Sequence, residues 1–326
     1  MRRRFFVLGA GAAAMTWRIA RSEPPTAVKR IGWLSPGGPD DPHIKEAVGL
    51  FLSKLKTLGW TQDAIAFYAR YAQDPGQYLS AAAELVAIKP DVLVAFGGTS
   101  LGAFKNETRI PIVFTGATDP VGQGLISSLG HPGGNITGFS IFDATIANKW
   151  LGIFKQLVPN LGHAICIFNP ATALTADYYI GALRAAGSSM KIEVEGVPVH
   201  NDAEIASVVG NAARDQNNGL IALPDGFLIS HVGRLIAEAA SARVPAFYFI
   251  AGQVAQGGLV SYAQDQNEET EGAAVYVDQI LRGKSPGDLP VQGPSHYQLA
   301  INLKTAKALG LAVPAGLIAS ADQVIE

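Results

Sequence analysis

Three short segments in the first half of the chain are echoed in the second half, in the same order. RIPIVFTGATDPVGQGL at 109–125 matches RVPAFYFIAGQVAQGGL at 243–259, with Arg, Pro, Gly and Leu in the same places at an offset of 134 residues. Two more pairs lie at similar offsets: 30–38 with 163–171, and 90–100 with 218–228. One pair could arise by chance because buried strands share apolar residues, but three in order favour a repeat. The sequence therefore predicts two similar α/β lobes, which usually enclose something between them.

Length and composition agree with two lobes. At 326 residues, the chain is near the size at which a single core stops growing and a fold divides. Its 48% hydrophobic and 16% charged residues predict a compact globular protein without a disordered tail. The 25 Lys and Arg residues nearly balance the 27 Asp and Glu residues, and no basic cluster occurs outside the extreme N-terminus. This balance argues against nucleic acid as a partner.

The first 22 residues are typical of an export signal. Arginines at 2–4 precede two phenylalanines and an apolar run that ends near Met15, and Ala20 and Ser22 suit a cleavage site after Ser22. The run is about 11 residues long, whereas a membrane span needs roughly 20. We therefore expect a twin-arginine-like signal over 1–22 and a mature protein in the periplasm.

The same segment contains a competing pattern. VLGAGAAA holds Gly9-x-Gly11-x-x-Ala14, the fingerprint of a dinucleotide-binding turn, which would favour a nucleotide-dependent enzyme. A true fingerprint follows a strand and has an acidic residue about 20 positions later, but residues 29–35 contain none. The flanking arginines favour the signal, and the enzyme remains an alternative with this run as its only support.

From about residue 27 onward, apolar runs alternate with amphipathic stretches, the order expected for a parallel α/β sheet. Asp41 and Pro42 predict the start of the first helix, and Gly59 predicts its end. Strands are expected at 31–34, 65–69, 92–96, 110–114, 164–168, 191–195, 219–223 and 245–249. Further helices are expected at 77–88, about 144–157, 172–186, 202–213, 227–240 and 266–282, with another beginning near Ser100.

The lobes are expected to be discontinuous in sequence. The loop at 131–138 ends the first run of elements, and the helix at 266–282 would return to pack on the first lobe. The expected division is 1–22 for the signal, 27–138 plus about 263–300 for lobe 1, 139–262 for lobe 2, and about 301–326 for lobe 2 or a tail packed on the hinge. Chain crossings near 138–143 and 262–266 would form this hinge.

Several longer motifs resemble a known family. They are DPVGQGLISSLGHPGGNITGFS at 119–140, GLIALPDGFLISH at 219–231, GGLVSY at 257–262, YVDQILRGKSPGDLPVQGP at 276–294 and INLKTAKALGL at 301–311. From about Arg30 to Glu326 the chain is similar to the exported substrate-binding proteins of ABC transporters whose studied members bind tryptophan or phenylalanine. The resemblance implies a type I periplasmic-binding fold, no catalysis, and delivery of a small solute to a membrane permease.

The chain departs from that family pattern at two turns. Members commonly have Gly-Thr-Pro after the third strand, where this chain has Gly98-Thr99-Ser100. They often have Asp-Pro at the matching turn of the second lobe, where this chain has Asp225-Gly226. The hydroxyls and the carboxylate are kept, but the shape of the pocket, and with it the solute, is left open.

Ligands of open parallel sheets lie beyond the carboxyl ends of the strands. This rule nominates Ser35, Gly98, Thr99, Ser100 and Thr118-Asp119 from the first lobe, and Asn169, Asp225 and Tyr248 from the second. Thr99 and Ser100 could hold a carboxylate, and Asp225 could pair with an ammonium ion. As alternatives, Ser100 and Asp225 could be helix caps. Asp119, before a proline, is better suited to a turn than to ligand contact.

The ring of an aromatic solute would need a stacking partner. Four aromatic side chains are candidates: Trp33, Phe96, Phe227 and Tyr248. Each is more often a core residue, and the polar tip of Tyr248 makes it the preferred candidate. Similarly, Cys166 lies inside the apolar run AICIF and is expected to be a packed thiol.

Sequence motifs of catalysis are absent. The chain has no phosphate-binding loop, zinc-protease motif or nucleophile elbow, and its six histidines are scattered singly. We therefore expect no catalysis, no metal and no cofactor. The expected protein is a monomer that binds a small amino-acid-like solute, possibly aromatic, for an ABC transporter permease. A solute sensor that docks a membrane receptor would share the fold and the pocket, and remains an alternative.

Overall fold

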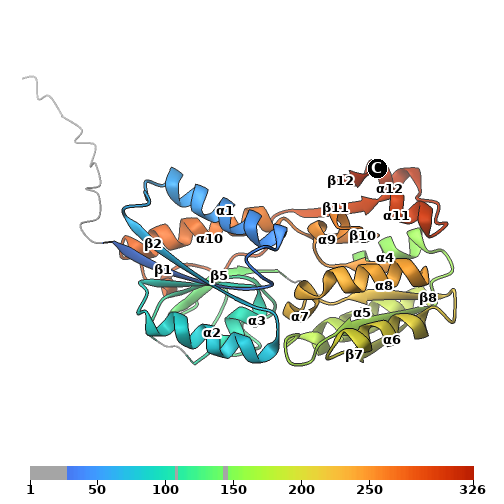
Figure 1. The fold of residues 1–326 in the computed structure, drawn as a ribbon, viewed down its shortest axis with the longest axis horizontal. Helices are drawn as coiled ribbons and strands as arrows, with labels where there is room; N and C mark the ends of the chain where they lie inside the picture. Colours follow the sequence, from blue (N-terminus) through green and yellow to red (C-terminus); the bar gives the residue numbers. More distant parts are fainter. Residues whose placement is uncertain (1–27, 107–108, 142–145) are drawn as a thin grey trace, which may run out of the picture.

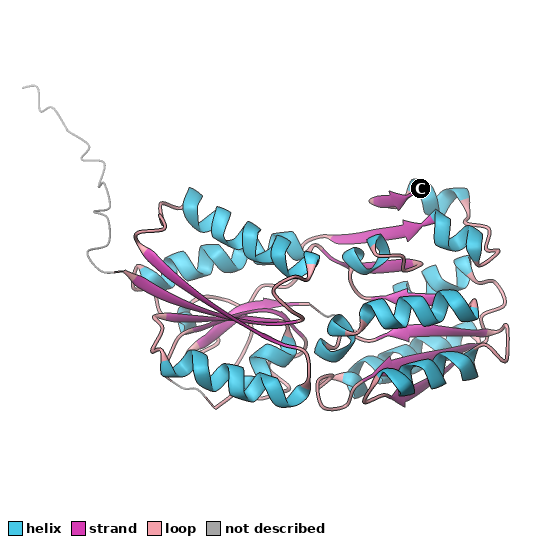
Figure 2. Ribbon diagram, in the orientation of Figure 1, coloured by secondary structure: helices cyan, strands magenta, loops and turns pink. Residues whose placement is uncertain are grey.

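The computed structural model describes residues 28–106, 109–141 and 146–326, so the predicted signal at 1–22 lies outside the described residues. Two lobes lie side by side along the long axis of the molecule, each with a sheet between layers of helices (Figures 1 and 2). The predicted architecture of two α/β lobes is confirmed. Within the described ranges, no helix combines the length and the apolar character that crossing a membrane requires.

The first lobe contains a five-stranded parallel sheet of order β2-β1-β3-β4-β5. Its strands are β1 Lys29–Pro36, β2 Ile65–Ala72, β3 Val92–Phe96, β4 Ile112–Ala117 and β5 Ile136–Ser140. Its helices are α1 Pro42–Thr57, α2 Pro75–Ala87, α3 Gly98–Ala103 and the late helix α10 Gln266–Leu281. Alternate side chains of a strand face opposite layers. Accordingly, Trp33 packs in the layer of α1 and α10, while Leu34 packs in the layer of α2 and α3.

The second lobe contains a seven-stranded sheet of order β12-β11-β10-β9-β8-β6-β7. Its strands are β6 His163–Phe168, β7 Glu193–Pro198, β8 Asn218–Ala222, β9 Ala246–Tyr248, β10 Val260–Gln264, β11 Tyr297–Asn302 and β12 Gln323–Ile325. Its helices are α4 Ile146–Leu157, α5 Ala176–Met190, α6 Asp202–Ala212, α7 Gly226–Ser230, α8 Val232–Ala242, α9 Ala251–Ala255, α11 Leu303–Ala308 and α12 Ala315–Ala319. A 3-10 turn, η1 Pro286–Asp288, follows α10.

The sequence repeat corresponds to equivalent strands. The order β7-β6-β8-β9-β10 reproduces β2-β1-β3-β4-β5, and the three matched segment pairs contain β1 and β6, β3 and β8, and β4 and β9. The second sheet is not wholly parallel, however, because β11 runs antiparallel to β10 after the chain returns from α10. The repeat therefore predicts the five shared strands, while the C-terminal segment adds β11 and β12 to the second sheet.

Two expected elements differ from the structure. The expected loop at 131–138 contains the start of β5, so the expected lobe boundary at 138/139 falls inside a strand of the first sheet. Its glycines suggested a turn, but at Gly138 a Cβ would lie 2.1 Å from the Phe114 carbonyl oxygen, so this glycine marks close strand approach. The single helix expected at 227–240 is divided at His231 into α7 and α8.

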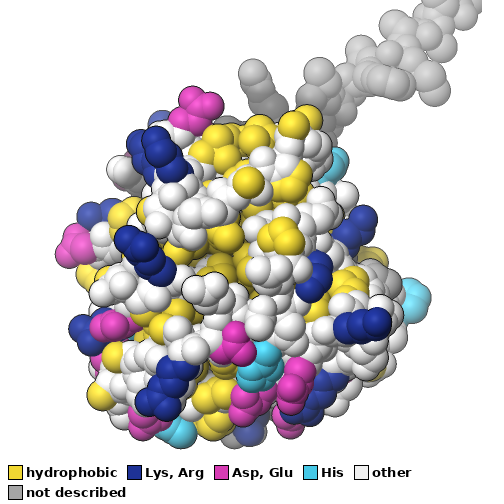
Figure 3. Space-filling model, turned by 90° about the vertical axis from the view of Figure 1, so that its right-hand side faces the viewer, with side chains coloured by type: hydrophobic (Ala, Val, Ile, Leu, Met, Phe, Trp, Pro, Cys, Tyr) yellow, Lys and Arg dark blue, Asp and Glu magenta, His cyan; other side chains and the backbone are white. Residues whose placement is uncertain are grey.

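The second lobe buries the free cysteine in its core and carries charged side chains on its end face. Cys166 is fully buried in β6, and burial raises the pKa of its thiol to about 12, so the prediction of a packed thiol is confirmed. Figure 3 looks onto the far end of the second lobe, where basic and acidic side chains are interspersed. This face therefore carries charges of both signs.

Candidate ligand-binding site between the lobes

A cavity lies where the carboxyl ends of the strands in the two lobes face each other. The space between its lining residues is about 780 Å³ when the part open to solvent is included. The apolar part of its wall includes Phe96, Ile141, Leu174, Ile229, Phe249 and Ile250. The polar part includes Thr99, Thr118, Thr172, Asp225, Gln266 and Glu269. Such a wall can enclose an apolar group and orient a polar one.

Hydrogen bonds join the two lobes around this cavity. The Thr99 hydroxyl donates to the Thr172 carbonyl oxygen at 2.9 Å, and the Thr118 and Tyr179 hydroxyls lie 2.8 Å apart. The Gly37 amide also donates to the Ser230 hydroxyl at 3.1 Å. The described conformation is therefore one in which the lobes are in contact.

The turn after β3 leaves backbone donors unused. Gly97 precedes α3 with φ of 89°, a conformation that favours glycine, and offers no side chain to cap the helix. Gly97, Gly98 and Thr99 line the cavity. The amides of residues 98–100 have no acceptor among the described residues. Of these, the amides of Gly98 and Thr99 belong to the cavity wall and are available to a negatively charged group.

In the matching turn after β8, the acidic side chain of Asp225 accepts hydrogen bonds from its own lobe. The Asp225 carboxylate caps α7 by accepting from the Phe227 amide at 2.8 Å. It also accepts from the Asn169 amide at 2.6 Å, from the Thr172 hydroxyl and from the Leu228 amide. Burial raises the pKa of Asp225 to about 6, although these hydrogen bonds oppose the shift. The carboxylate lines the cavity, but four protein donors already occupy it.

A second buried carboxyl in the cavity was not predicted from the sequence. Glu269 lies in the first turn of α10 and is 5% exposed, and its Oε1 has no hydrogen-bond partner among the described residues. Burial raises its pKa well above the usual range, the Gly116 amide opposes the shift by hydrogen bonding, and Glu268 and Asp265 raise the pKa further. An acidic pair directly after a crossing strand was the signal that could have identified it.

The structure separates the predicted site residues into two groups. Gly98, Thr99, Thr118 and Asp225 line the cavity, whereas Ser35, Ser100, Asp119, Asn169 and Tyr248 do not. Ser35 and Ser100 are fully buried, and their hydroxyls have no partner among the described residues. Asp119 has φ of 43° and accepts from the Gly122 amide at 2.9 Å, which matches the turn-forming alternative.

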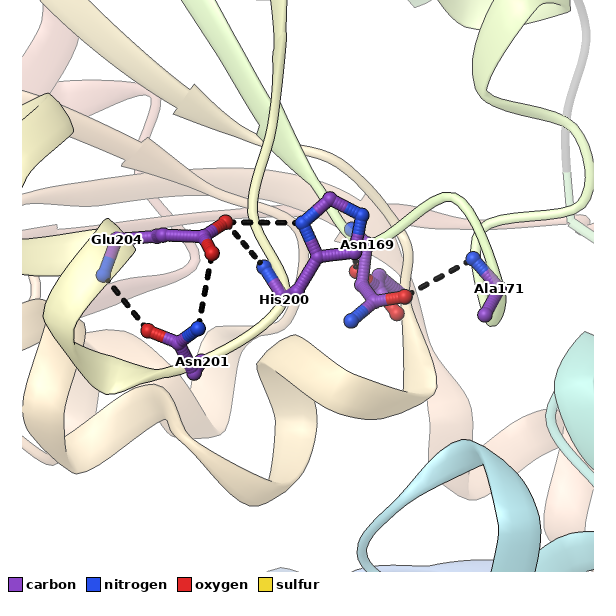
Figure 4. A network of polar contacts seen from close by, with 6 residues as sticks. Asn169, Ala171, His200, Asn201 and Glu204 are labelled. Atoms are coloured by element: carbon purple, nitrogen blue, oxygen red, sulfur yellow. Dashed lines mark hydrogen bonds and ion pairs between the residues drawn. The ribbon is translucent and has the colours of Figure 1, made fainter.

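Two second-lobe residues lie close to the cavity but use their side chains elsewhere. The Asn169 side chain accepts from the Ala171 amide at 2.9 Å, close to the contacts among His200, Asn201 and Glu204 at the start of α6 (Figure 4). Tyr248 packs against Gly258, since a Cβ there would lie 2.8 Å from its ring. The next residue, Phe249, lines the cavity instead.

Of the other aromatic candidates, one reaches the cavity. Phe96 lines it and stacks on Trp33, with ring centroids 5.1 Å apart. Trp33 and Phe227 are buried core residues. In the part of the chain that the structure describes, no group of three or more His, Cys, Asp or Glu side chains could hold a metal ion.

Comparison with known proteins agrees with the fold. The model of the family described as ABC transporter substrate binding protein matches residues 40–325. The chain belongs to this family. A tyrosine-binding protein of Clostridioides difficile is 27% identical over 275 residues, covering 83% of this chain and 79% of the relative.

Three solved structures are also similar to this binding protein. A conserved domain protein from Vibrio cholerae shares 27% identity with a TM-score of 0.83, covering 91% of this chain and all of that chain. The ABC domain from Streptococcus pneumoniae in complex with L-Trp shares 24% identity with a TM-score of 0.82, covering 92% and 100%. A ligand-free, open structure of a substrate-binding protein from Clostridium difficile shares 22% identity with a TM-score of 0.63, covering 92% and 99%. The predicted family and the type I periplasmic-binding fold are confirmed.

Proposed function

We propose that this protein captures a small amino acid with an aromatic or other apolar side chain between its lobes and delivers it to an ABC transporter permease. The observation that supports this proposal most strongly is the cavity between the lobes, whose wall combines apolar side chains with the unpaired backbone amides of Gly98 and Thr99. A zwitterion with an apolar side chain needs this combination of contacts. The tyrosine-binding relative and the L-Trp complex support the choice of solute.

The carboxylate of the solute would bind at the turn after β3. The amides of Gly98 and Thr99 supply donors there, whereas the buried Ser100 does not line the cavity. Phe96 and Phe249 come from different lobes and both line the cavity, so they would enclose the side chain from two sides. The site is proposed to work without catalysis, metal or cofactor.

The lobes would close over the solute by a hinge. The crossings that connect them include the junction between β10 and α10, where Gln264 and Gln266 line the cavity. The other expected crossing includes 142–145, outside the described residues. Contacts such as the Thr99–Thr172 hydrogen bond would break on opening. The open, ligand-free structure of the Clostridium difficile binding protein supports such a motion.

Delivery to a permease requires export, and the twin-arginine pattern at 2–4 supports a periplasmic location. We propose that residues 1–22 are removed and that the mature protein is a monomer. We also propose the lobe division expected from the sequence, with all of β5 assigned to lobe 1.

The proposal is tested by thermal unfolding of refolded, ligand-stripped protein with L-tryptophan, L-tyrosine, L-phenylalanine and sugars. A ligand that binds only the folded state raises its stability by mass action, by about 2.7 kcal/mol at a hundred times Kd. We expect at least one aromatic amino acid to raise the unfolding temperature, and sugars to leave it unchanged. Stabilisation by a sugar and by none of the three amino acids would refute the proposed solute class.

A further inference from the structure

The cavity contains two buried carboxyl groups, and they differ in how many hydrogen bonds they already accept. A carboxylate has about four lone-pair positions. Asp225 receives donors from Asn169, Thr172, Phe227 and Leu228 within its own lobe. An ammonium ion could bind Asp225 only by displacing donors that hold the second lobe together. Asp225 is therefore poorly placed to bind a cation, although the sequence made it the first candidate.

Glu269 has the opposite environment. It is 5% exposed, lines the cavity, and leaves Oε1 without a partner among the described residues. The side-chain oxygen of Gln266, in the same wall, is also buried without a partner there. Leaving buried polar atoms unpaired is costly, so two such acceptors side by side in a cavity indicate a ligand with several donors. An ammonium ion has three.

Glu269 is also adjacent to the unpaired amides of the turn after β3. Gly116 joins the two, because its amide bonds the Glu269 carboxyl and its carbonyl oxygen lies 3.6 Å from a Cβ placed on Gly98. Gly116 lies where the register between β4 and β5 shifts, and its φ is 64°. An irregularity of this kind can direct an amide out of the ladder and toward a site. An α-amino acid carries its carboxylate and ammonium on one carbon, so its two subsites must be neighbours.

We propose that Glu269, assisted by the side-chain oxygen of Gln266, binds the α-ammonium group of the solute, while the amides of Gly98 and Thr99 bind its α-carboxylate. This inference rests on the proposed function, because it assumes an amino-acid solute. Both charged groups of the solute then bind the first lobe and its α10 helix. The second lobe encloses the solute afterwards and contributes the apolar wall.

The test compares Glu269→Gln with Glu268→Gln by calorimetry. The Glu268 side chain is about 45% exposed and lies one residue away on α10, so Glu268→Gln removes a similar charge outside the cavity wall. The probes are L-tyrosine and L-tryptophan, with their desamino counterparts 3-(4-hydroxyphenyl)propionate and indole-3-propionate. Thermal unfolding of each variant shows that it is folded.

We expect Glu269→Gln to weaken binding of the amino acids by about 30-fold or more, the usual effect of removing one partner of a buried charge pair. Binding of the desamino acids should be unchanged or tighter, because they bring no ammonium. Glu268→Gln should stay within about twofold for all four probes.

The outcomes separate this inference from the proposed function. If wild-type protein binds none of L-tyrosine, L-tryptophan and L-phenylalanine, the proposed solute class fails and the inference fails with it. If wild-type protein binds one and Glu269→Gln binds it within about twofold, a change of only ~0.4 kcal/mol, the inference alone is wrong. Equal weakening of the amino acid and its desamino counterpart would assign Glu269 a structural role and would also overturn it.

Discussion

The turn after β3 and the turn after β8 occupy equivalent places in the two repeated sheets, but they treat the start of the following helix differently. Gly97 provides no cap, and the amides of residues 98–100 stay unpaired among the described residues. Asp225 caps α7 with its own carboxylate, which also accepts hydrogen bonds from the Asn169 amide and the Thr172 hydroxyl. A repeated backbone therefore yields one turn that is open to a ligand and one that is already occupied.

The difference suggests distinct roles for the two lobes. The open turn and Glu269 belong to the first lobe and its α10 helix, and they would bind the charged groups of the solute. The occupied turn places Gly226 against the first lobe, where a Cβ would lie 2.4 Å from the Tyr78 hydroxyl oxygen and 2.8 Å from Thr99 Oγ1. The second lobe is thus shaped to approach closely and cover the site.

The largest effect should come from removing the Asp225 carboxylate, which caps α7. Asp225→Ala leaves four buried donors without their acceptor, and each unpaired donor costs about 1–3 kcal/mol. We expect the free energy of unfolding to fall by on the order of 4 kcal/mol, measured by denaturant titration. Asp215→Ala, at an exposed position outside the cavity, is the control. Unchanged stability with lost ligand binding would show that Asp225 is a ligand group, and that the turn after β8 is not reserved for hydrogen bonds within its own lobe.

Changing pH should distinguish the two buried carboxyls. The folded protein keeps a proton on Asp225 up to a pKa of about 6, against 3.8 for an ordinary aspartate, and burial also raises the pKa of Glu269 well above its usual value. The unfolded chain loses these protons first, so the free energy of unfolding should fall as pH rises from about 4 to about 6, by up to about 3 kcal/mol from Asp225. Denaturant titrations across this range measure the fall.

A variant separates the contribution of Glu269 to this profile. In ligand-free wild-type protein the raised pKa of Glu269 should add to the fall in the free energy of unfolding as pH rises, and this addition should be missing in Glu269→Gln. Identical pH profiles for the two proteins would remove Glu269 from the explanation.

Close approach of the lobes is tested at Gly226. Gly226→Ala adds a methyl group that meets Tyr78 and Thr99 only when the lobes are in contact, so it should weaken solute binding about tenfold, or ~1.4 kcal/mol. Thermal unfolding without ligand should change little. Gly233→Ala is the matched control, because no atom lies within 4 Å of the added Cβ. Equal affinity of the two variants would mean that binding does not require this contact.

The smallest effect is expected at the hydrogen bond between the lobes. Thr99→Val removes the hydroxyl that donates to the Thr172 carbonyl oxygen at 2.9 Å, and should weaken binding by about 1 kcal/mol, or roughly fivefold. Thr99→Ser should restore most of the affinity, because it keeps the hydroxyl. Calorimetry of both variants decides the point, and wild-type affinity in Thr99→Val would exclude a role for this bond in closure.

The sequence predicts the fold better than the site. The repeat identifies the five equivalent strands because a buried parallel strand and its turn have a distinctive apolar pattern. It could not place β5, where Gly138 serves close packing rather than a turn. Tyr248 was expected in the site from its position at a strand end, but Phe249 faces the cavity instead. Glu269 was missed because the acidic pair at 268–269 lies in a helix predicted only to pack on the first lobe, and the pair does not show which of its two members faces the cavity.

A crystal structure of the protein with bound L-tyrosine or L-tryptophan tests the central claim most directly. The solute carboxylate should accept hydrogen bonds from the amides of Gly98 and Thr99, and its ammonium should lie within hydrogen-bond distance of Glu269 Oε1. Asp225 should keep its bonds to Asn169 and Phe227. An ammonium ion on Asp225, with Glu269 away from the solute, would contradict the claim that the first lobe binds both charged groups.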